Sequence, residues 1–258
     1  MLALLWLLAA AAPLAQDTTL PVRESRNGIR YELTAPDSQA LPALEAVVEG
    51  GRRNAERFFG GRYRTPLLVR IYPDRRSLTA HWAAAWAAPD LKTECWMVAS
   101  GVAQELAMLS PRSWTTDACE HDPADTAGMR RVIWHEMVHV YHGQGNPHPT
   151  FDGMDDLGWL VEGVATLASG QYAAEHRGDA RAALRAGLAP TRLADAWSGR
   201  YRYGVAASLV AFVDATWGRR TLVWLLAGTT QQEILAALGT TESDLIGRWR
   251  DWTLRQDD

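Results

Sequence analysis

The sequence predicts an α+β fold with two lobes, a mixed N-terminal lobe over residues 16–145 and a helical lobe over residues 146–258, with a cleft between them. Three observations support this prediction. Strand-like patterns occur only before residue 110, helical patterns fill the chain after residue 176, and a long apolar helix is expected between these two parts. With 258 residues, the chain can bury the core of one domain or of two lobes that share a cleft.

Residues 1–15 predict a secretory leader. The run is apolar and ends in small residues before the polar Gln16. It is too short for a comfortable transmembrane span, so we expect cleavage near Ala15 and a secreted or periplasmic protein without stable membrane association. Pro13 and the absence of Lys and Arg depart from the usual leader pattern, which leaves an uncleaved membrane anchor as the alternative.

The next part of the chain predicts strands that alternate with helices. Strands are expected at 29–33 and 66–73, and helices at 41–59 and 75–88. The spacing of apolar residues in 98–109 fits a helix or a strand. We interpret the second half of this segment as a strand because a Ser-Pro pair ends it. If this strand lies at the sheet edge beside the central helix, its free backbone groups could pair with an extended peptide. An ordinary strand or helix is the alternative.

The chain has two cysteines, Cys95 and Cys119. In an oxidising compartment they could pair and close a loop that the chain-entropy model values at roughly 3 kcal/mol. Two free buried thiols are the alternative, because the sequence cannot show that they are close in space. Their spacing matches neither a zinc thiolate site nor a redox CxxC motif.

The central helix is expected to begin at Asp125 or Thr126, either of which can cap it, and to end at Gly143. Apolar residues lie at nearly every angle around it, namely Met129, Val132, Ile133, Trp134, Met137, Val138 and Val140. A helix that is apolar all round is buried, so the polar side chains on it need partners.

This helix contains His135, Glu136 and His139 in the spacing HExxH. Positions i and i+4 share one face of a helix, so both imidazoles can bind a single Zn²⁺ ion at about 2.0–2.1 Å. A bound zinc lowers the pKa of its water, and a neighbouring carboxylate can take the proton as that water attacks a carbonyl. The motif predicts a zinc hydrolase with Glu136 as the general base. A core helix whose histidines bond backbone carbonyls is the alternative.

A second buried helix is expected over 155–170, with aspartates to cap its start and a glycine at its end. Its one acid between these ends is Glu162, and burial requires that this charge meet a cation or several donors. Because His₂Glu is an established ligand set of catalytic zinc, we predict Glu162 as the third ligand. Gly163 would let this helix approach another backbone closely. The other candidates for a third ligand are His142, His148, Asp152, Asp155 and Asp156.

The remainder of the chain predicts a helical lobe that closes the cleft. Helices are expected at 180–187, 204–216, 220–227, 231–238 and 242–254.

HExxH followed by Trp159-Leu-Val-Glu-Gly-Val-Ala165 resembles the gluzincin metallopeptidases, whose second motif reads W-x-x-E-G-x-A. The sequence is most similar to the bacterial peptidase MA-like group, from about residue 41 to residue 254. This resemblance implies a zincin-like fold with zinc on His135, His139 and Glu162. It also implies that Glu136 acts as base and proton shuttle.

Several gluzincins also use a tyrosine or histidine of the C-terminal lobe to stabilise the oxyanion that forms during hydrolysis. Tyr203, which precedes an apolar helix, is the matching candidate, and Tyr201 is the next. Such a residue must place a donor where negative charge develops. Packing at an amphipathic surface is the alternative for either tyrosine.

The sequence also departs from related patterns. Thr166 stands where thermolysin-like enzymes place an aspartate that orients a ligand, although a hydroxyl can also accept from an imidazole N–H. No GAMEN-type strand is present, which disfavours an aminopeptidase. Gly145 occupies the position of the third histidine of metzincins.

The charge of the chain argues against one class of partner. The formal net charge is −4 and the arginines are scattered, so nucleic acid is not an expected partner. The sequence as a whole predicts an exported zinc metallopeptidase acting on a peptide or protein substrate. The alternatives are a zinc hydrolase of a non-peptide amide or ester, and a non-catalytic binding module in which zinc is structural.

Overall fold

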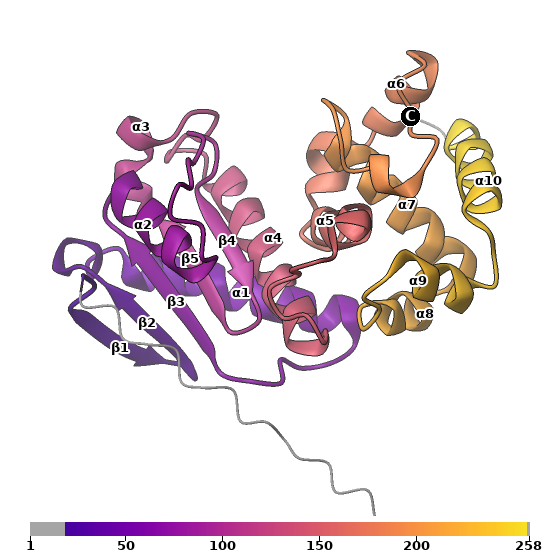
Figure 1. Cartoon of the computed structure of the whole chain (residues 1–258). Coiled ribbons are helices and arrows are strands. Elements are labelled where there is room, and N and C mark those ends of the chain that lie inside the picture. The colour runs from indigo at the N-terminus through magenta and orange to yellow at the C-terminus, as the bar shows by residue number, and fades with distance from the viewer. Residues whose placement is uncertain (1–18, 257–258) are drawn as a thin grey trace, which may run out of the picture.

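The computed structural model describes residues 19–256, so the expected leader at residues 1–15 lies outside the described part. Within it the chain is α+β, as the sequence predicts, with a sheet in the N-terminal half and helices in the C-terminal half (Figure 1). The strands are β1 (Val22–Arg26), β2 (Ile29–Leu33), β3 (Leu67–Tyr72), β4 (Ala99–Val102) and β5 (Glu105–Leu109). Their order in the sheet is β1-β2-β3-β5-β4.

The sheet is parallel at its centre and antiparallel at both edges. Strand β3 pairs in parallel with β2 and β5, whereas β1 and β4 pair antiparallel with their neighbours. The strands expected around 29–33 and 66–73 are therefore confirmed.

The strand expected in the second half of 98–109 is confirmed as β5, but its suggested position at the sheet edge is wrong. Both halves are strands, and the edge strand is the first half, β4, while β5 lies between β3 and β4. A two-residue connection, Ala103-Gln104, joins them, and Ala103 takes a positive φ of 23°. Such tight hairpin turns usually contain Gly, Asn or Asp, and their absence hid the turn from sequence analysis.

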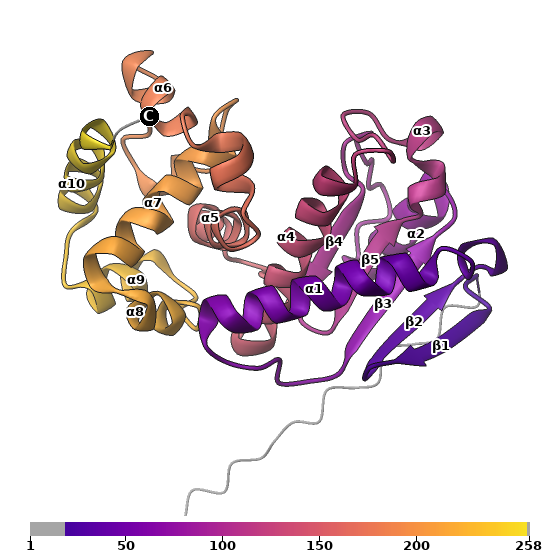
Figure 2. The same cartoon turned by 180° about the vertical axis from the view of Figure 1, so that it is seen from behind.

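Helices cover both faces of the sheet (Figure 2). On one face lie α1 (Leu41–Phe59) and α4 (Thr126–Gly145), whose apolar residues pack against strand residues such as Val69 and Ile71. On the other face lie α2 (Arg75–Ala85) and the short α3 (Trp114–Asp117). Side chains alternate between the two faces along a strand. Because every residue of β3 is buried, this strand contributes side chains to the core on both faces of the sheet.

The charged residues on the α2 side of the sheet form a closed cluster, which we call the Arg70 cluster. Buried Arg70 donates to Glu32 at 2.8 Å and to Glu105 at 2.7 Å. His81 of α2 lies 2.5 Å from the second oxygen of Glu105. Arg30 lies 3.6 Å from Glu32 at the solvent side. Each buried charge of this cluster therefore has an opposite charge or a hydrogen-bond partner within reach.

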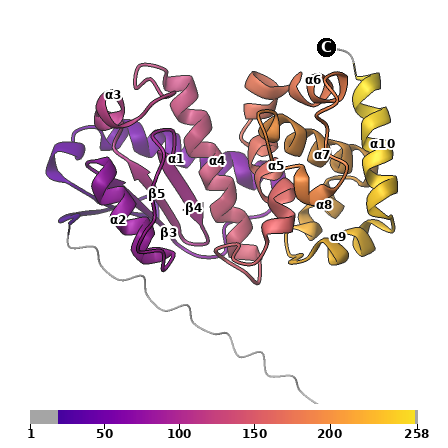
Figure 3. The ribbon, with the colours of Figure 1, turned by 45° about the horizontal axis from the view of Figure 1, so that its top comes forward.

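The C-terminal half is helical, and its helices surround a second core (Figure 3). They are α5 (Gly158–Ala168), α6 (Asp179–Arg185), α7 (Arg202–Trp217), α8 (Arg219–Leu225), α9 (Gln231–Leu238) and α10 (Glu242–Arg255). The helices expected after residue 177 are thus confirmed, with ends that shift by no more than two residues. Ala55 and Phe59 of α1 and Val138 of α4 also belong to this core, so both helices contact both halves. None of the helices in residues 19–256 is long and apolar enough to cross a membrane.

Cys95 and Cys119 form a disulfide, with their Cα atoms 5.2 Å apart. The bond joins the segment between α2 and β4 to the segment after α3. Trp96, next to Cys95, is further held by a hydrogen bond between His121 Nε2 and its carbonyl oxygen at 2.9 Å.

Candidate metal centre

Helix α4 carries the HExxH residues. Asp125 caps it by accepting from the Gly128 N–H at 2.9 Å, which settles the choice between the two expected caps. The helix continues past Gly143, the expected end, to Gly145. A Cβ atom on Gly143 would lie 2.6 Å from the Ala103 nitrogen and from the Pro149 carbonyl oxygen. Gly143 therefore allows two other segments to approach α4, and it does not end the helix.

Helix α5 carries Glu162 and faces α4. A short 3-10 turn, Asp155–Leu157, precedes it, and neither aspartate caps α5, since the capping position is Leu157 without a side-chain bond. A Cβ atom on Gly163 would lie 2.5 Å from the Ala206 carbonyl oxygen of α7. The expected close approach at Gly163 is thus confirmed, and it fixes the position of α5 against α7.

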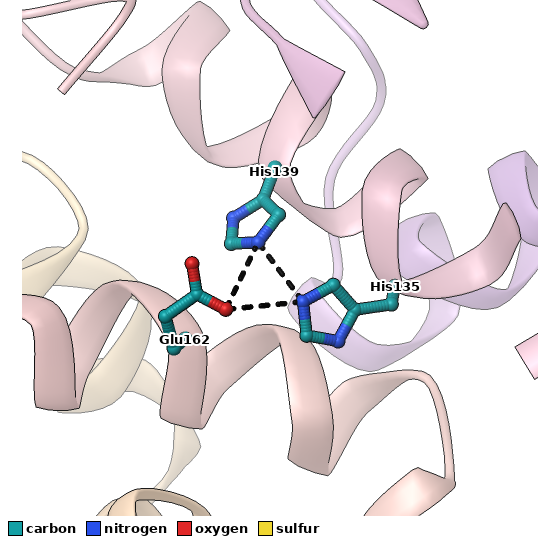
Figure 4. Close-up of side chains that lie close together, drawn as sticks. All are labelled: His135, His139 and Glu162. Atoms are coloured by element: carbon teal, nitrogen blue, oxygen red, sulfur yellow. Dashed lines mark hydrogen bonds and ion pairs between the residues drawn. The ribbon is translucent and has the colours of Figure 1, made fainter. Parts of the chain in front are cut away.

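Three ligand atoms from these helices converge on one point (Figure 4). His135 Nε2 lies 3.0 Å from His139 Nε2, and the Glu162 Oε2 atom lies 3.2 Å and 3.5 Å from those two nitrogens. Ligand atoms about 2.0–2.1 Å from a tetrahedral zinc are separated by roughly 3.3–3.4 Å. The observed triangle therefore has the size that a zinc ion requires.

A hydrogen bond determines which ring nitrogen of His135 carries the proton. Its Nδ1 lies 2.7 Å from Gln171 Oε1, which can only accept, so Nδ1 carries the proton. In the neutral ring, Nε2 then presents a lone pair to the other two ligand atoms. A bound cation would satisfy all three atoms at once, whereas a single shared proton would not. The donor set therefore fits a divalent metal.

Gln171 is a residue of the candidate site that sequence analysis missed. It follows the glycine that ends the α5 segment, and nothing in the local pattern distinguishes it from an exposed polar residue. Thr166, considered for the orienting role, is fully buried and its Oγ1 has no hydrogen-bond partner among residues 19–256. The side chain that orients His135 therefore comes from the turn after α5.

The other candidate ligands lie elsewhere. His142 Nε2 donates to the Leu226 carbonyl at 3.0 Å, and burial lowers its pKa to about 3. His148 Nδ1 contacts the Asp152 carbonyl at 2.8 Å. Of residues 19–256, the His, Cys, Asp and Glu side chains close enough to hold one metal ion are His135, His139 and Glu162.

Charge and burial shift the pKa values of these groups in the metal-free protein. Burial would raise the pKa of Glu162, but the charges and hydrogen bonds of His139 and His135 outweigh it, and the pKa lies well below its usual range. Burial would lower the pKa of His135, but the hydrogen bond with Glu162 and the charge of Glu136 raise it. The carboxylate is therefore ionised and the site attracts positive charge.

Glu136 lies beside the three ligand atoms and is not one of them. Burial raises its pKa, while the charges of His135 and His139 act in the opposite direction. Strand β4 passes directly over it, because a Cβ on Gly101 would lie 2.0 Å from the Glu136 carbonyl oxygen. A raised pKa makes a carboxylate a stronger proton acceptor, as a general base requires.

The structure separates the two candidate tyrosines. Tyr203, in the first turn of α7, lies with its ring centroid 6.2 Å from that of His135 and lines the same cleft. Burial raises its pKa, so it keeps its proton as a donor. Tyr201 packs against the helical core and its hydroxyl accepts from Arg200 at 2.5 Å.

A cleft of about 830 Å³ opens onto these residues. Strand β4, helix α4 and the segment after α3 line one side, and α5, the turn after it and the start of α7 line the other. Glu162 keeps 25% of its side chain exposed, whereas the histidine side chains are 8% exposed. The ligand atoms are thus accessible from the cleft, as a catalytic site with an open coordination position requires.

No family model, no curated protein and no solved structure matches this chain.

Proposed function

We propose that the protein is an exported zinc-dependent metallopeptidase of the gluzincin type, with a zincin-like fold of two lobes and the active site in the cleft between them. The observation that carries this proposal is the triangle of His135, His139 and Glu162, which opens onto a cleft with Glu136 beside it. The sequence resemblance to the peptidase MA-like group supports the same function. The disulfide is consistent with an oxidising, extracytoplasmic location.

Each residue has a role in this mechanism. His135, His139 and Glu162 would hold zinc, and Gln171 would keep His135 in the tautomer that binds it. A zinc ion there would polarise the scissile carbonyl and make a water molecule more acidic.

Glu136 accepts the proton of the attacking water and returns it to the leaving amine, which its raised pKa permits. The Tyr203 hydroxyl donates to the oxygen on which negative charge develops.

An experiment on Glu136 tests the proposal. Purified protein would be analysed for bound metal and assayed with a mixture of unmodified peptides, beside Glu136→Gln and a control, Glu175→Gln. Glu175 lines the same cleft and forms an ion pair with Arg131 of α4. We expect Glu136→Gln to lower the hydrolysis rate by about 10²- to 10⁴-fold while zinc content stays at that of the wild type and the control.

Other outcomes would point elsewhere. Full turnover by Glu136→Gln would remove Glu136 from the mechanism. Hydrolysis of amides or esters but not of peptides would favour a non-peptide hydrolase. Stoichiometric zinc without turnover of any of these substrates would favour a binding module.

A further inference from the structure

Arg202 is an arginine held inside the cleft by aromatic rings from both halves of the molecule. Its guanidinium carbon lies 5.2 Å from the ring centre of Tyr203 and 5.6 Å from that of Trp197, both in the helical half. It also lies 5.5 Å from the ring centre of Trp96, which belongs to the sheet half. These faces attract the cation and restrict its position.

The charge of Arg202 has no carboxylate partner. Within residues 19–256 no Asp or Glu forms an ion pair with it, although it is only partly exposed. Arg131, the other arginine of the cleft, differs, because Glu175 and Asp125 both lie within ion-pair distance of it. A partly buried cation without an anion is costly, and the aromatic faces offset only part of this cost.

The chemistry of the guanidinium indicates which group could pair with the charge of Arg202. Arginine presents five N–H donors in a planar fork that matches the two oxygens of a carboxylate. A hydrogen bond with Tyr203 involves this side chain and leaves further donors. The cleft therefore contains a cation that can bind a carboxylate of an incoming molecule.

Arg202 also lies close to the candidate metal centre. Two successive contacts separate them, the first of 5.2 Å from the guanidinium carbon to the Tyr203 ring and the second of 6.2 Å from that ring to His135. An extended peptide covers about 3.3–3.6 Å per residue. A carboxylate bound by Arg202 would therefore lie within about three residues of the metal.

We propose that Arg202 is a specificity residue that binds a substrate carboxylate within about three residues of the bond to be cleaved. The carboxylate is either the C-terminal carboxylate of a peptide or the side chain of an Asp or Glu residue. This inference rests on the proposed peptidase function, which it deepens by naming the charge of the preferred substrate.

Peptide binding tests the inference without requiring turnover. Zinc-loaded Glu136→Gln protein would be titrated by calorimetry with three forms of a neutral hexapeptide, one with an amidated C-terminus, one with a free C-terminus, and one amidated with Glu in place of an internal Gln. The same titrations would be done after adding Arg202→Gln or, as the matched control, Arg200→Gln. Arg200 is exposed and contacts Tyr201 outside the cleft.

We expect one of the two carboxylate peptides to bind about 10- to 100-fold more tightly than the neutral peptide, the range for hydrogen bonds to a charged group. Which peptide it is identifies the source of the carboxylate. Arg202→Gln should remove this preference and leave binding of the neutral peptide unchanged, whereas Arg200→Gln should change neither. Arg202→Lys, which keeps the charge but loses the fork, should retain part of the preference.

Three results would overturn the inference. Equal binding of the neutral and carboxylate peptides, or no binding of any of them, would show that no carboxylate site exists. A preference that persists in Arg202→Gln would place the carboxylate on the metal or on another group. Equal weakening of every peptide in Arg202→Gln would show a structural role. Carboxylate-dependent binding by a protein that hydrolyses no peptide would leave the role of Arg202 standing and reject the peptidase function.

Discussion

The Arg70 cluster and the candidate metal centre are both buried groups of charged and polar side chains, but their charges are balanced in different ways. Around Arg70, two carboxylates flank one guanidinium, and a histidine and two peripheral arginines, Arg23 and Arg30, lie next to these carboxylates. Around His135, two imidazole nitrogens and a carboxylate oxygen face one another at 3.0 to 3.5 Å, and Nδ1 of His139 has no partner within residues 19–256.

The two clusters differ in whether they supply their own counter-charges. A cluster that supplies its own counter-charges needs nothing from outside and can sit under a covering helix. The cluster around His135 instead turns three potential metal ligands toward one point, and it opens onto a cleft. Burial of charge alone does not distinguish the two, whereas the balance of donors and acceptors does.

The largest effect is expected from Glu162→Ala, which removes one acceptor of the metal centre. A four-ligand zinc site is worth about 10–16 kcal/mol, or about 2.5–4 kcal/mol per ligand, so losing one of three protein ligands should weaken zinc binding by about 100- to 1000-fold. Competition with a fluorescent zinc chelator measures this constant. Glu105→Gln, which alters a carboxylate of the Arg70 cluster, should leave zinc affinity unchanged. Equal affinities in wild type and Glu162→Ala would move the third ligand elsewhere.

The reciprocal experiment is Arg70→Met. Removing the central cation leaves Glu32 and Glu105 buried with less compensation, so the free energy of unfolding should fall by about 3–5 kcal/mol. Urea denaturation measures the loss, and the zinc content of the folded protein should not change. Adding Glu32→Gln and Glu105→Gln should recover much of the lost stability. No recovery would mean that charge balance is not what the cluster provides.

Gln171→Ala should have an intermediate effect. The imidazole of His135 would lose the acceptor that holds its Nδ1 proton, so zinc affinity should fall by about 10- to 100-fold. Gln171→Glu, which keeps an acceptor, should restore most of it. Thr166→Val serves as the control, because the Thr166 hydroxyl has no hydrogen-bond partner in the described part of the chain. If Thr166→Val weakened zinc binding as much as Gln171→Ala, Gln171 would not be the orienting residue.

The smallest effect concerns His142, one turn beyond His139, which is a buried structural histidine. Its pKa of about 3 in the folded protein lies below its ordinary value of 6.5, so the unfolded state binds a proton first as pH falls. The stability contribution is complete above pH 6.5 and is lost between pH 6.5 and 3. At pH 5 the loss should be about 2 kcal/mol.

Urea denaturation at pH 7 and at pH 5, with a chelator present, measures this loss in the free energy of unfolding. The variant His142→Gln cannot take up a proton, so its stability should fall less between the two pH values than that of the wild type. Identical losses in both proteins would assign the acid sensitivity to other groups.

The sequence predicts the parts of the site that obey a regular spacing. His135 and His139 lie four residues apart on a helix, and helical geometry alone places them together. Glu162 follows from being a single acid in an apolar segment. The convergence of all three, across two helices, depends on Gly163 packing against α7, which the sequence only suggests.

What the sequence could not predict are contacts made by irregular segments. Gln171 reaches His135 from a turn whose path depends on the packing of α5, and Thr166 points into the core instead. The Ala103-Gln104 turn lacks the usual turn residues, so the sequence indicated only the second of the two strands that this turn joins. Asp155 and Asp156 resemble a cap, but both lie in a 3-10 turn that precedes the helix, and the capping position is Leu157.

Helix α1 has a consequence for how the whole chain unfolds. Its first half packs in the core beneath the sheet, and Ala55 and Phe59 near its other end pack in the core of the helical half. One continuous helix of 19 residues therefore packs in both cores. Neither core can melt without exposing part of this helix, so heating should produce a single calorimetric peak. For the same reason, hinge-like opening about the junction is disfavoured, and incoming molecules meet a cleft whose walls are already set.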